Sequence, residues 1–165
     1  MFRRSKIMKD LLIFLDIDGV LNTTNARVTR YEVRESNVEA LGMLAERFGK
    51  KGYNVKLILS STWRLGYERE VERCSPQIQK LIAKLARVGL SIYDRTPVYK
   101  ECTRDVEIRR YLRGYQPEEE AFEYIILDDD ASVFDVDAIK EMNFYRVSEH
   151  KGLTRTDVEK LVKLL

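Results

Sequence analysis

The sequence predicts an α/β protein with a doubly wound, parallel sheet of about five strands and helices on both faces. Two observations lead to this prediction. Short apolar runs alternate along the chain with segments whose apolar residues recur at helical spacing, as in parallel βαβ units. Polar residues directly follow three of these runs. The 165 residues have the length of one domain, so 1–165 is taken as a single domain with a basic segment at 1–10.

The strands are predicted where four to six mostly apolar residues stand between polar or turn-forming residues. In chain order, the predicted strands are 11–16, 55–60, 90–93, 124–128 and 144–147. The first contains the longest apolar run of the chain, Leu11 to Leu15. Five residues are far too few to cross a membrane, so no membrane attachment is expected.

Helices are predicted between and after these strands. The first carries Val38, Leu41 and Phe48 on one face, and Ser36 with Glu39 has the spacing of a capping box at its start. Three more segments repeat the i, i+3, i+4, i+7 spacing of apolar residues. These segments are 78–85, 108–115 and 158–165.

Composition narrows the class of protein. Apolar residues make up 44% and charged residues 34%, which is ordinary for a globular domain. The net charge of +2 is too small to indicate a nucleic-acid or membrane partner by itself. Cys74 and Cys102 form no CxxC pair and His150 is the only histidine, which argues against structural zinc. A cytoplasmic location is expected.

The stretch "DIDGV" follows the first predicted strand. Asp16 and Asp18 stand two residues apart, so on an extended backbone their side chains leave the same face. Two ionised carboxylates this close repel each other unless a cation lies between them or one takes up a proton. Gly19 allows the backbone to turn sharply at this point.

Two more polar clusters follow predicted strands. Ser60, Ser61 and Arg64 come after the second strand, and the aspartates 128–130 come after the fourth. Taken singly, each cluster also suits a turn, a helix cap or a solvated loop. In a parallel sheet, however, the carboxyl ends of the strands share one edge. Their joint placement therefore favours a single site.

These motifs resemble those of the haloacid dehalogenase-like (HAD) hydrolases. "DIDGV" is similar to the first motif, Ser60 to the second, a basic residue opening a later helix to the third, and "YIILDD" to the fourth. The segments "DIDGVLN", "LSSTWR", "RDVEIRRYL" and "KGLT" more closely resemble the HAD domains of RNA repair ("Swiss Army Knife") proteins and of polynucleotide phosphatases. The resemblance implies a Rossmann-like fold without a cap domain.

The third-motif cation is either Lys100 or Arg104. Thr103 is predicted to cap the helix that contains Ile108, which places Arg104 in its first turn. A cation there opposes the helix dipole unless an anion lies nearby, and a phosphoryl group would be such an anion. Arg104 is therefore preferred. The alternative is an ordinary ion pair of Arg104 with Glu101 or Glu107.

The resemblance implies a magnesium-dependent phosphatase. Asp16 would attack phosphorus and form an aspartyl-phosphate, while Asp18 would protonate the leaving oxygen and then activate water. Ser60 and Arg104 would bind the phosphoryl oxygens. The Mg²⁺ ligands would be Asp16, the backbone carbonyl of Asp18, and Asp128 or Asp129. The further substrate-binding residues expected are Gly19, Asn22, Ser61, Arg64, Arg27 and Arg30.

The substrate expected is a terminal phosphate, most readily the 3′-phosphate, on RNA or DNA. About fourteen residues separate Asn22 from Ser36, enough for a short flap, and an uncapped site admits a phosphate on a bulky molecule. The flap carries Tyr31 among the arginines 27, 30 and 34, which suits a phosphodiester chain. The alternative is a solvated hairpin, since Glu32 and Glu35 halve its charge. The alternatives are a nucleotide or other small-molecule phosphatase, a phosphoprotein phosphatase, and a HAD-like module that binds without catalysis. The absence of a G-x-x-x-x-G-K-[ST] motif excludes a P-loop kinase.

Overall fold

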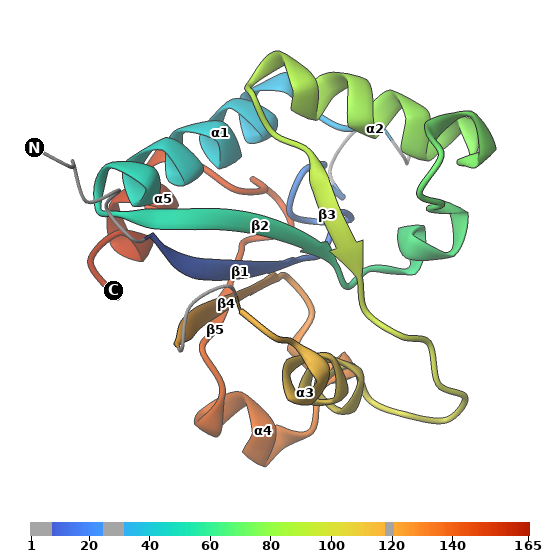
Figure 1. Ribbon diagram of the computed structural model, residues 1–165, viewed down its shortest axis with the longest axis vertical. Coiled ribbons are helices and arrows are strands. Elements are labelled where there is room, and N and C mark those ends of the chain that lie inside the picture. Colours follow the sequence, from blue (N-terminus) through green and yellow to red (C-terminus); the bar gives the residue numbers. More distant parts are fainter. Residues whose placement is uncertain (1–7, 25–31, 118–120) are drawn as a thin grey trace, which may run out of the picture.

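The structure, a computed structural model, describes residues 8–24, 32–117 and 121–165. These residues form five strands, all parallel, in one sheet of order β3-β2-β1-β4-β5 (Figure 1). The strands are β1 (Lys9–Leu15), β2 (Tyr53–Leu59), β3 (Ile92–Arg95), β4 (Phe122–Asp128) and β5 (Phe144–Arg146). The α/β class and the five-stranded parallel sheet predicted from the sequence are confirmed.

Strand β1 lies at the centre of the sheet, between β2 and β4. Its residues from Leu11 to Leu15 are completely buried. Because successive side chains of a strand point to opposite faces, Ile13 belongs to one core and Phe14 to the other. A run that is apolar on both faces is what a central parallel strand requires.

Helices cover both faces of the sheet (Figure 1). Helices α1 (Glu35–Lys50), α2 (Pro76–Arg87) and α5 (Arg155–Leu161) pack on one face, and α3 (Arg104–Gly114) and α4 (Val136–Glu141) on the other. Apolar residues at the helical spacing are buried in α1, α2 and α5, whereas in the segment 108–115 only Ile108 is buried and the other apolar residues are half-buried. In α2, for example, the buried residues are Ile78, Leu81 and Leu85.

The structure corrects one prediction about the helices and adds one helix that was not predicted. Helix α1 begins at Glu35 with Arg34 as its N-cap, and no side chain caps it. Ser36 is therefore an exposed residue inside the helix, and the predicted capping box with Glu39 is wrong. Helix α4 was not predicted because its six residues contain too little helical repeat. Asp135 caps it through hydrogen bonds from the backbone N–H groups of Asp137 and Ala138.

Polar groups at the amino end of the sheet are paired with one another. Asp10 in β1 accepts hydrogen bonds from Asn54, Lys56 and Tyr115, and the Lys56–Asp10 ion pair of 3.1 Å is buried. This satisfied network contrasts with the carboxyl end of the sheet, where carboxylates crowd together. The carboxyl end of the sheet is therefore the candidate location of the active site.

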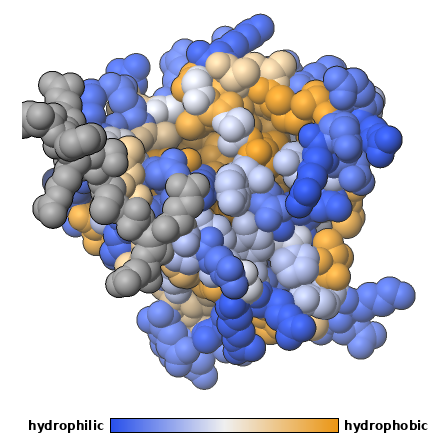
Figure 2. All heavy atoms as spheres, viewed as in Figure 1, coloured by the Kyte–Doolittle hydropathy of each residue, from blue (hydrophilic) through white to orange (hydrophobic). Residues whose placement is uncertain are grey.

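The surface of the molecule is mixed in character. On the face shown in Figure 2, hydrophilic residues dominate the outline, and hydrophobic residues reach the surface mainly in the upper part of this view. Among the described residues, no helix has both the length and the apolar character that a membrane span requires.

Candidate active site

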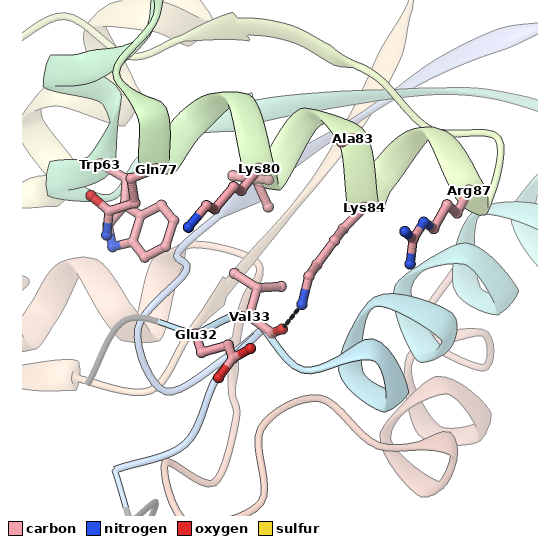
Figure 3. Close-up of a pocket in the computed structure, with 9 residues that line it drawn as sticks. Glu32, Val33, Trp63, Gln77, Lys80, Ala83, Lys84 and Arg87 are labelled. Carbon is pink, nitrogen blue, oxygen red and sulfur yellow. Dashed lines mark hydrogen bonds between the residues drawn. The ribbon is translucent and has the colours of Figure 1, made fainter. Parts of the chain in front are cut away.

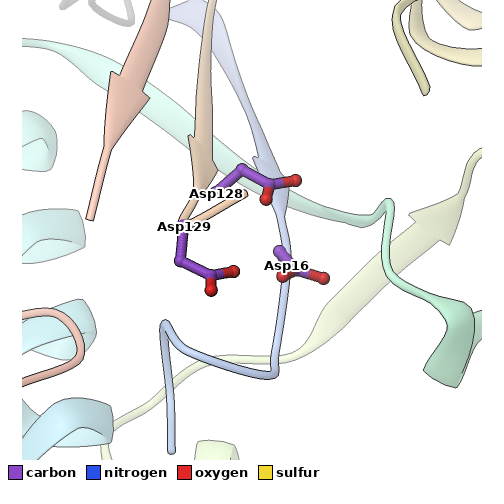
Figure 4. A group of neighbouring side chains, drawn as sticks. All are labelled: Asp16, Asp128 and Asp129. Carbon is purple, nitrogen blue, oxygen red and sulfur yellow. The ribbon is translucent and has the colours of Figure 1, made fainter. Parts of the chain in front are cut away.

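Three carboxylates converge at the carboxyl end of the sheet. Asp16 follows β1, Asp128 ends β4 and Asp129 follows it, and one oxygen from each lies within 4.8 Å of the others (Figure 4). Asp128 is fully buried and Asp16 is nearly so. The two acidic motifs that the sequence placed at strand ends therefore meet in one site.

The register of the central strands explains this convergence. Leu15 of β1 lies beside Leu127 of β4, so the next residue of each strand is an aspartate. The N–H of Asp16 donates to the carbonyl of Leu127 at 3.0 Å, and the N–H of Ser60 donates to the carbonyl of Leu15 at 3.1 Å. Ordinary parallel pairing thus brings the ends of β1, β2 and β4 together.

The crowding of carboxylates changes their protonation. Burial, together with the charge of Asp128, raises the pKa of Asp16 to about 8, although Arg104 partly opposes this. Burial also raises the pKa of Asp128 and that of Asp129. At neutral pH and without a cation, the cluster retains a proton that ordinary aspartates would release.

Arg104 is the cation that the site already contains. Its Nη1 forms an ion pair with Asp128 and lies 3.4 Å from an oxygen of Asp16. Burial lowers the pKa of Arg104, but the charges of Asp128 and Asp16 outweigh this effect and raise it. The sequence argument expected a phosphoryl group as the anion beside the first turn of α3, and the structure places the carboxylates of Asp16 and Asp128 there. The alternative pairing of Arg104 with Glu101 or Glu107 is wrong, since Glu107 pairs with Arg64 at 2.6 Å.

The donor set fits Mg²⁺, a hard cation that takes carboxylate oxygens and water. Asp16, Asp128 and Asp129 supply such oxygens from one small region. The raised pKa of Asp16 indicates that positive charge is under-supplied there, even with Arg104 in contact. A divalent ion held by these carboxylates would supply the missing charge.

Magnesium is expected to raise the melting temperature more at about pH 8 than at about pH 5. A carboxyl whose pKa is raised in the folded protein destabilises the fold as pH rises between its unfolded and folded pKa values. At the lower pH the ion must displace the proton of Asp16, and at the higher pH the proton is already leaving. Thermal unfolding with and without magnesium measures the difference. An equal shift at both pH values would contradict the coupling, and Asp16→Asn should flatten the pH dependence.

Asp18 lies beside the cluster and is held by two donors. The Nδ2 of Asn22 donates to one oxygen at 2.8 Å, and the Nε1 of Trp63 donates to the other at 3.1 Å. The Oδ1 of Asn22 also accepts from the N–H of Gly19 at 2.8 Å. The carboxylate of Asp18 is thus fixed in orientation, and it is only half-buried. The contact with Trp63 was not predicted, because the spacing of residues does not show which side chain of the loop after β2 reaches Asp18.

Gly19 is required for close approach to Asp129. Its φ of +78° lies in the region that side chains rarely adopt, and a Cβ at this position would collide with the carboxyl group of Asp129. Gly19 is predicted from sequence as a substrate-binding residue. The structure gives it a further role, since it lets the motif at 16–20 turn against the loop after β4.

The polar residues after β2 divide into two kinds. The hydroxyl of Ser60 is buried and, within the described part of the chain, has no hydrogen-bond partner. Ser61 caps the 3₁₀ helix Thr62–Gly66 by accepting from the N–H of Trp63. Arg64 donates to the carbonyls of Ser60 and Ser61 and pairs with Glu107. Ser60 is therefore available for a ligand, while Ser61 and Arg64 make contacts that shape the loop.

The predicted basic flap lies partly within the described residues. Arg27, Arg30 and Tyr31 fall at 25–31, outside the described residues. Arg34 is described and lies exposed at the N-cap of α1. Lys100, the competitor of Arg104, is exposed in the loop before α3. The contacts of Arg104 with Asp16 and Asp128 make it the basic residue of the cluster.

A Rossmann-like parallel sheet with aspartates at the carboxyl ends of β1 and β4 is the arrangement expected of a HAD-like hydrolase. A family model for the HAD domain in Swiss Army Knife RNA repair proteins matches residues 12–158. The chain belongs to this family, and the resemblance inferred from its motifs is confirmed. The comparison with curated proteins gave no match.

Proposed function

We propose that the protein is a magnesium-dependent phosphatase that removes a terminal phosphate, the 3′-phosphate, from RNA or DNA through an aspartyl-phosphate. The observation that carries the proposal is the arrangement of Asp16, Asp128 and Asp129 within 4.8 Å beside Arg104. Such a site concentrates ligands for a cation and for a phosphoryl group. Asp18 adds a separately held carboxyl group next to it.

Asp16 is the nucleophile in this mechanism. One of its oxygens attacks phosphorus, the bond from phosphorus to the ester oxygen breaks, and the phosphoryl group becomes attached to Asp16. Asp16 suits this role because it stands at the end of the rigid central strand, anchored by its N–H to Leu127. A fixed nucleophile loses little entropy when it reacts.

Asp18 is the general acid and base. It gives a proton to the departing ester oxygen and later takes one from the water that attacks the aspartyl-phosphate. That second attack breaks the bond between phosphorus and Asp16 and releases inorganic phosphate. The hydrogen bonds from Asn22 and Trp63 hold the carboxyl group while it exchanges the proton.

The remaining groups manage negative charge. Bound Mg²⁺ would neutralise Asp16, Asp128 and Asp129 and polarise the phosphoryl group. Arg104 would exchange part of its contact with the carboxylates for a phosphoryl oxygen. Ser60 would donate its buried hydroxyl, which would end the cost of an unsatisfied polar group, about 1–3 kcal/mol.

Two observations support a nucleic-acid end as the substrate. The family that contains the chain is described as a domain of RNA repair proteins. In addition, every strand of the described residues belongs to one sheet. The carboxyl end of that sheet, where the carboxylate cluster lies, carries loops and single helices. A phosphate on a long molecule can reach such an edge without being enclosed.

A substrate panel tests the proposal. With magnesium, the protein should hydrolyse a 3′-phosphorylated oligonucleotide with a higher kcat/KM than a 5′-phosphorylated one, a mononucleotide or a phosphopeptide. Activity on the oligonucleotide should fall steeply with salt, since phosphate contacts release counterions. A preference for mononucleotide or phosphopeptide would contradict the nucleic-acid substrate but would leave the phosphatase activity supported. Equal rates with magnesium and with chelator would overturn the magnesium-dependent mechanism, and the absence of phosphate release from every ester would overturn the phosphatase itself.

A further inference from the structure

A groove opens beside the general acid. It has a volume of about 710 Å³ and runs between α2 and residues 32–33, with Trp63 at one end and Arg87 at the other (Figure 3). We call it the α2 groove. Its volume lies within the range of about 300–1,000 Å³ that is usual for ligand sites. The groove contains none of Asp16, Asp128 and Asp129, so it is separate from the carboxylate cluster.

Trp63 connects the α2 groove to the reaction. Its indole lines the groove, and its Nε1 donates to Asp18 at 3.1 Å. In an in-line displacement the leaving oxygen departs on the side opposite the nucleophile Asp16. That oxygen must meet Asp18 to be protonated. The body of the leaving group is therefore directed past Trp63 and into the α2 groove.

The lining of the α2 groove has the character of a nucleotide site. Val33 and Leu81 make its wall apolar, which suits a base or a sugar. Lys80, Lys84 and Arg87 stand one helical turn apart along α2 and give the rim a stripe of positive charge.

The three cations of the rim differ in the interactions that they already make within the protein. Lys84 donates to the carbonyl of Val33, and Arg87 pairs with Glu35 at 3.0 Å. Lys80 is exposed, and among the described residues it forms no ion pair. Glu32 is the acidic residue on the opposite wall. Because the three cations outnumber the carboxylates of Glu32 and Glu35, the rim complements a chain of phosphates.

We infer that the α2 groove holds the nucleotides that precede the terminal phosphate of a single-stranded substrate. The terminal nucleoside lies at the Trp63 end of the groove, and the next phosphates of the chain meet Lys80 and its neighbours on α2. This inference rests on the proposed function and adds to it the surface that recognises the polynucleotide. Lys80 is the specificity-determining residue of that surface.

A binding experiment with the full chain tests the inference. The Asp16→Asn variant is mixed with magnesium and 5′-labelled, 3′-phosphorylated oligonucleotides of increasing length, and Kd is measured by fluorescence anisotropy. Adding Lys80→Glu should weaken binding about three- to tenfold, because an exposed attraction becomes a repulsion. It should also lower the slope of log Kd against log salt by about 1. The gain in affinity with each added nucleotide should shrink.

Lys140→Glu is the matched control. This substitution makes the same change of charge as Lys80→Glu, but it lies on α4, on the opposite face of the sheet (Figure 1). It should leave affinity, length dependence and salt slope unchanged. If Lys80→Glu behaves like Lys140→Glu, the α2 groove is not the polynucleotide surface. If an acidic phosphopeptide bound more tightly than the oligonucleotide, and Lys80→Glu abolished that binding, the proposal that nucleotides occupy the groove would also be contradicted.

A kinetic measurement separates this inference from the proposed function. In an otherwise unchanged chain, Lys80→Glu should lower kcat/KM for the oligonucleotide more than for a small aryl phosphate, whose leaving group is too short to reach α2. Aryl phosphate hydrolysis together with an unchanged ratio would reject the α2 groove and keep the phosphatase. A failure to hydrolyse both the oligonucleotide and the aryl phosphate would reject the phosphatase, and the binding measurement would still decide on the groove.

Discussion

Replacing Asp16 by asparagine is expected to abolish turnover, with a loss of about 10⁴-fold or more in kcat. The amide cannot serve as the nucleophile, and the volume of the side chain barely changes. The fold should survive the change, since the carboxyl group of Asp16 is held in a crowded site that raises its pKa. Without magnesium, the variant should be at least as heat-stable as the parent at about pH 8, because a buried repulsion has been removed.

The measurement is steady-state hydrolysis of an aryl phosphate, accompanied by thermal unfolding. Asp130→Asn is the matched control, since it makes the same change in the run of aspartates at the carboxyl end of β4. The carboxylate of Asp130 caps a 3₁₀ turn through Ser132 and stands outside the cluster. The control should retain its activity. Near-parent turnover by Asp16→Asn would rule out the covalent mechanism.

Replacing Asp18 by asparagine is expected to produce a loss that depends on the leaving group. For an alkyl phosphate the rate should fall by about 10²–10⁴-fold, because the departing alkoxide needs a proton. An aryl oxide needs less help, so phosphorylation of Asp16 should continue with a good aryl leaving group. The second step should then slow, since no base activates the water.

Two measurements test this expectation. A series of aryl phosphates should show rates that depend more steeply on the pKa of the leaving phenol in Asp18→Asn than in the parent. Acid quenching should trap phosphorylated protein during turnover of the most reactive ester. An equal loss for alkyl and aryl esters would assign Asp18 a role other than proton transfer.

The sequence predicted the parts of the site that depend on strand ends. An apolar run indicates a central strand, and the residue after it must lie at the carboxyl edge of the sheet. The sequence alone therefore places Asp16, Ser60 and Asp128 together. Arg104 was also accessible, because a cation in the first turn of a helix requires an anion nearby. The structure supplies that anion as Asp16 and Asp128.

Contacts between distant segments were not predictable in this way. Nothing in the spacing of residues indicates that Trp63 donates to Asp18 or that Glu107 holds Arg64. The same is true of Asn37, whose amide donates to the carbonyls of Lys151 and Leu153. Such contacts depend on how loops pack after the sheet has formed. Periodicity describes one element at a time and contains no information about them.

The central position of β1 has a consequence for the order of events during folding. Its partner β4 follows more than a hundred residues later in the chain, so closing that loop costs considerable entropy before any contact repays it. The pairing of β1 with β2 spans a shorter loop and is expected to form earlier. Asp128 and Asp129 would then join Asp16 only in the last stages of folding. The repulsion among these carboxylates would therefore arise after most of the core has formed and can offset its unfavourable free energy.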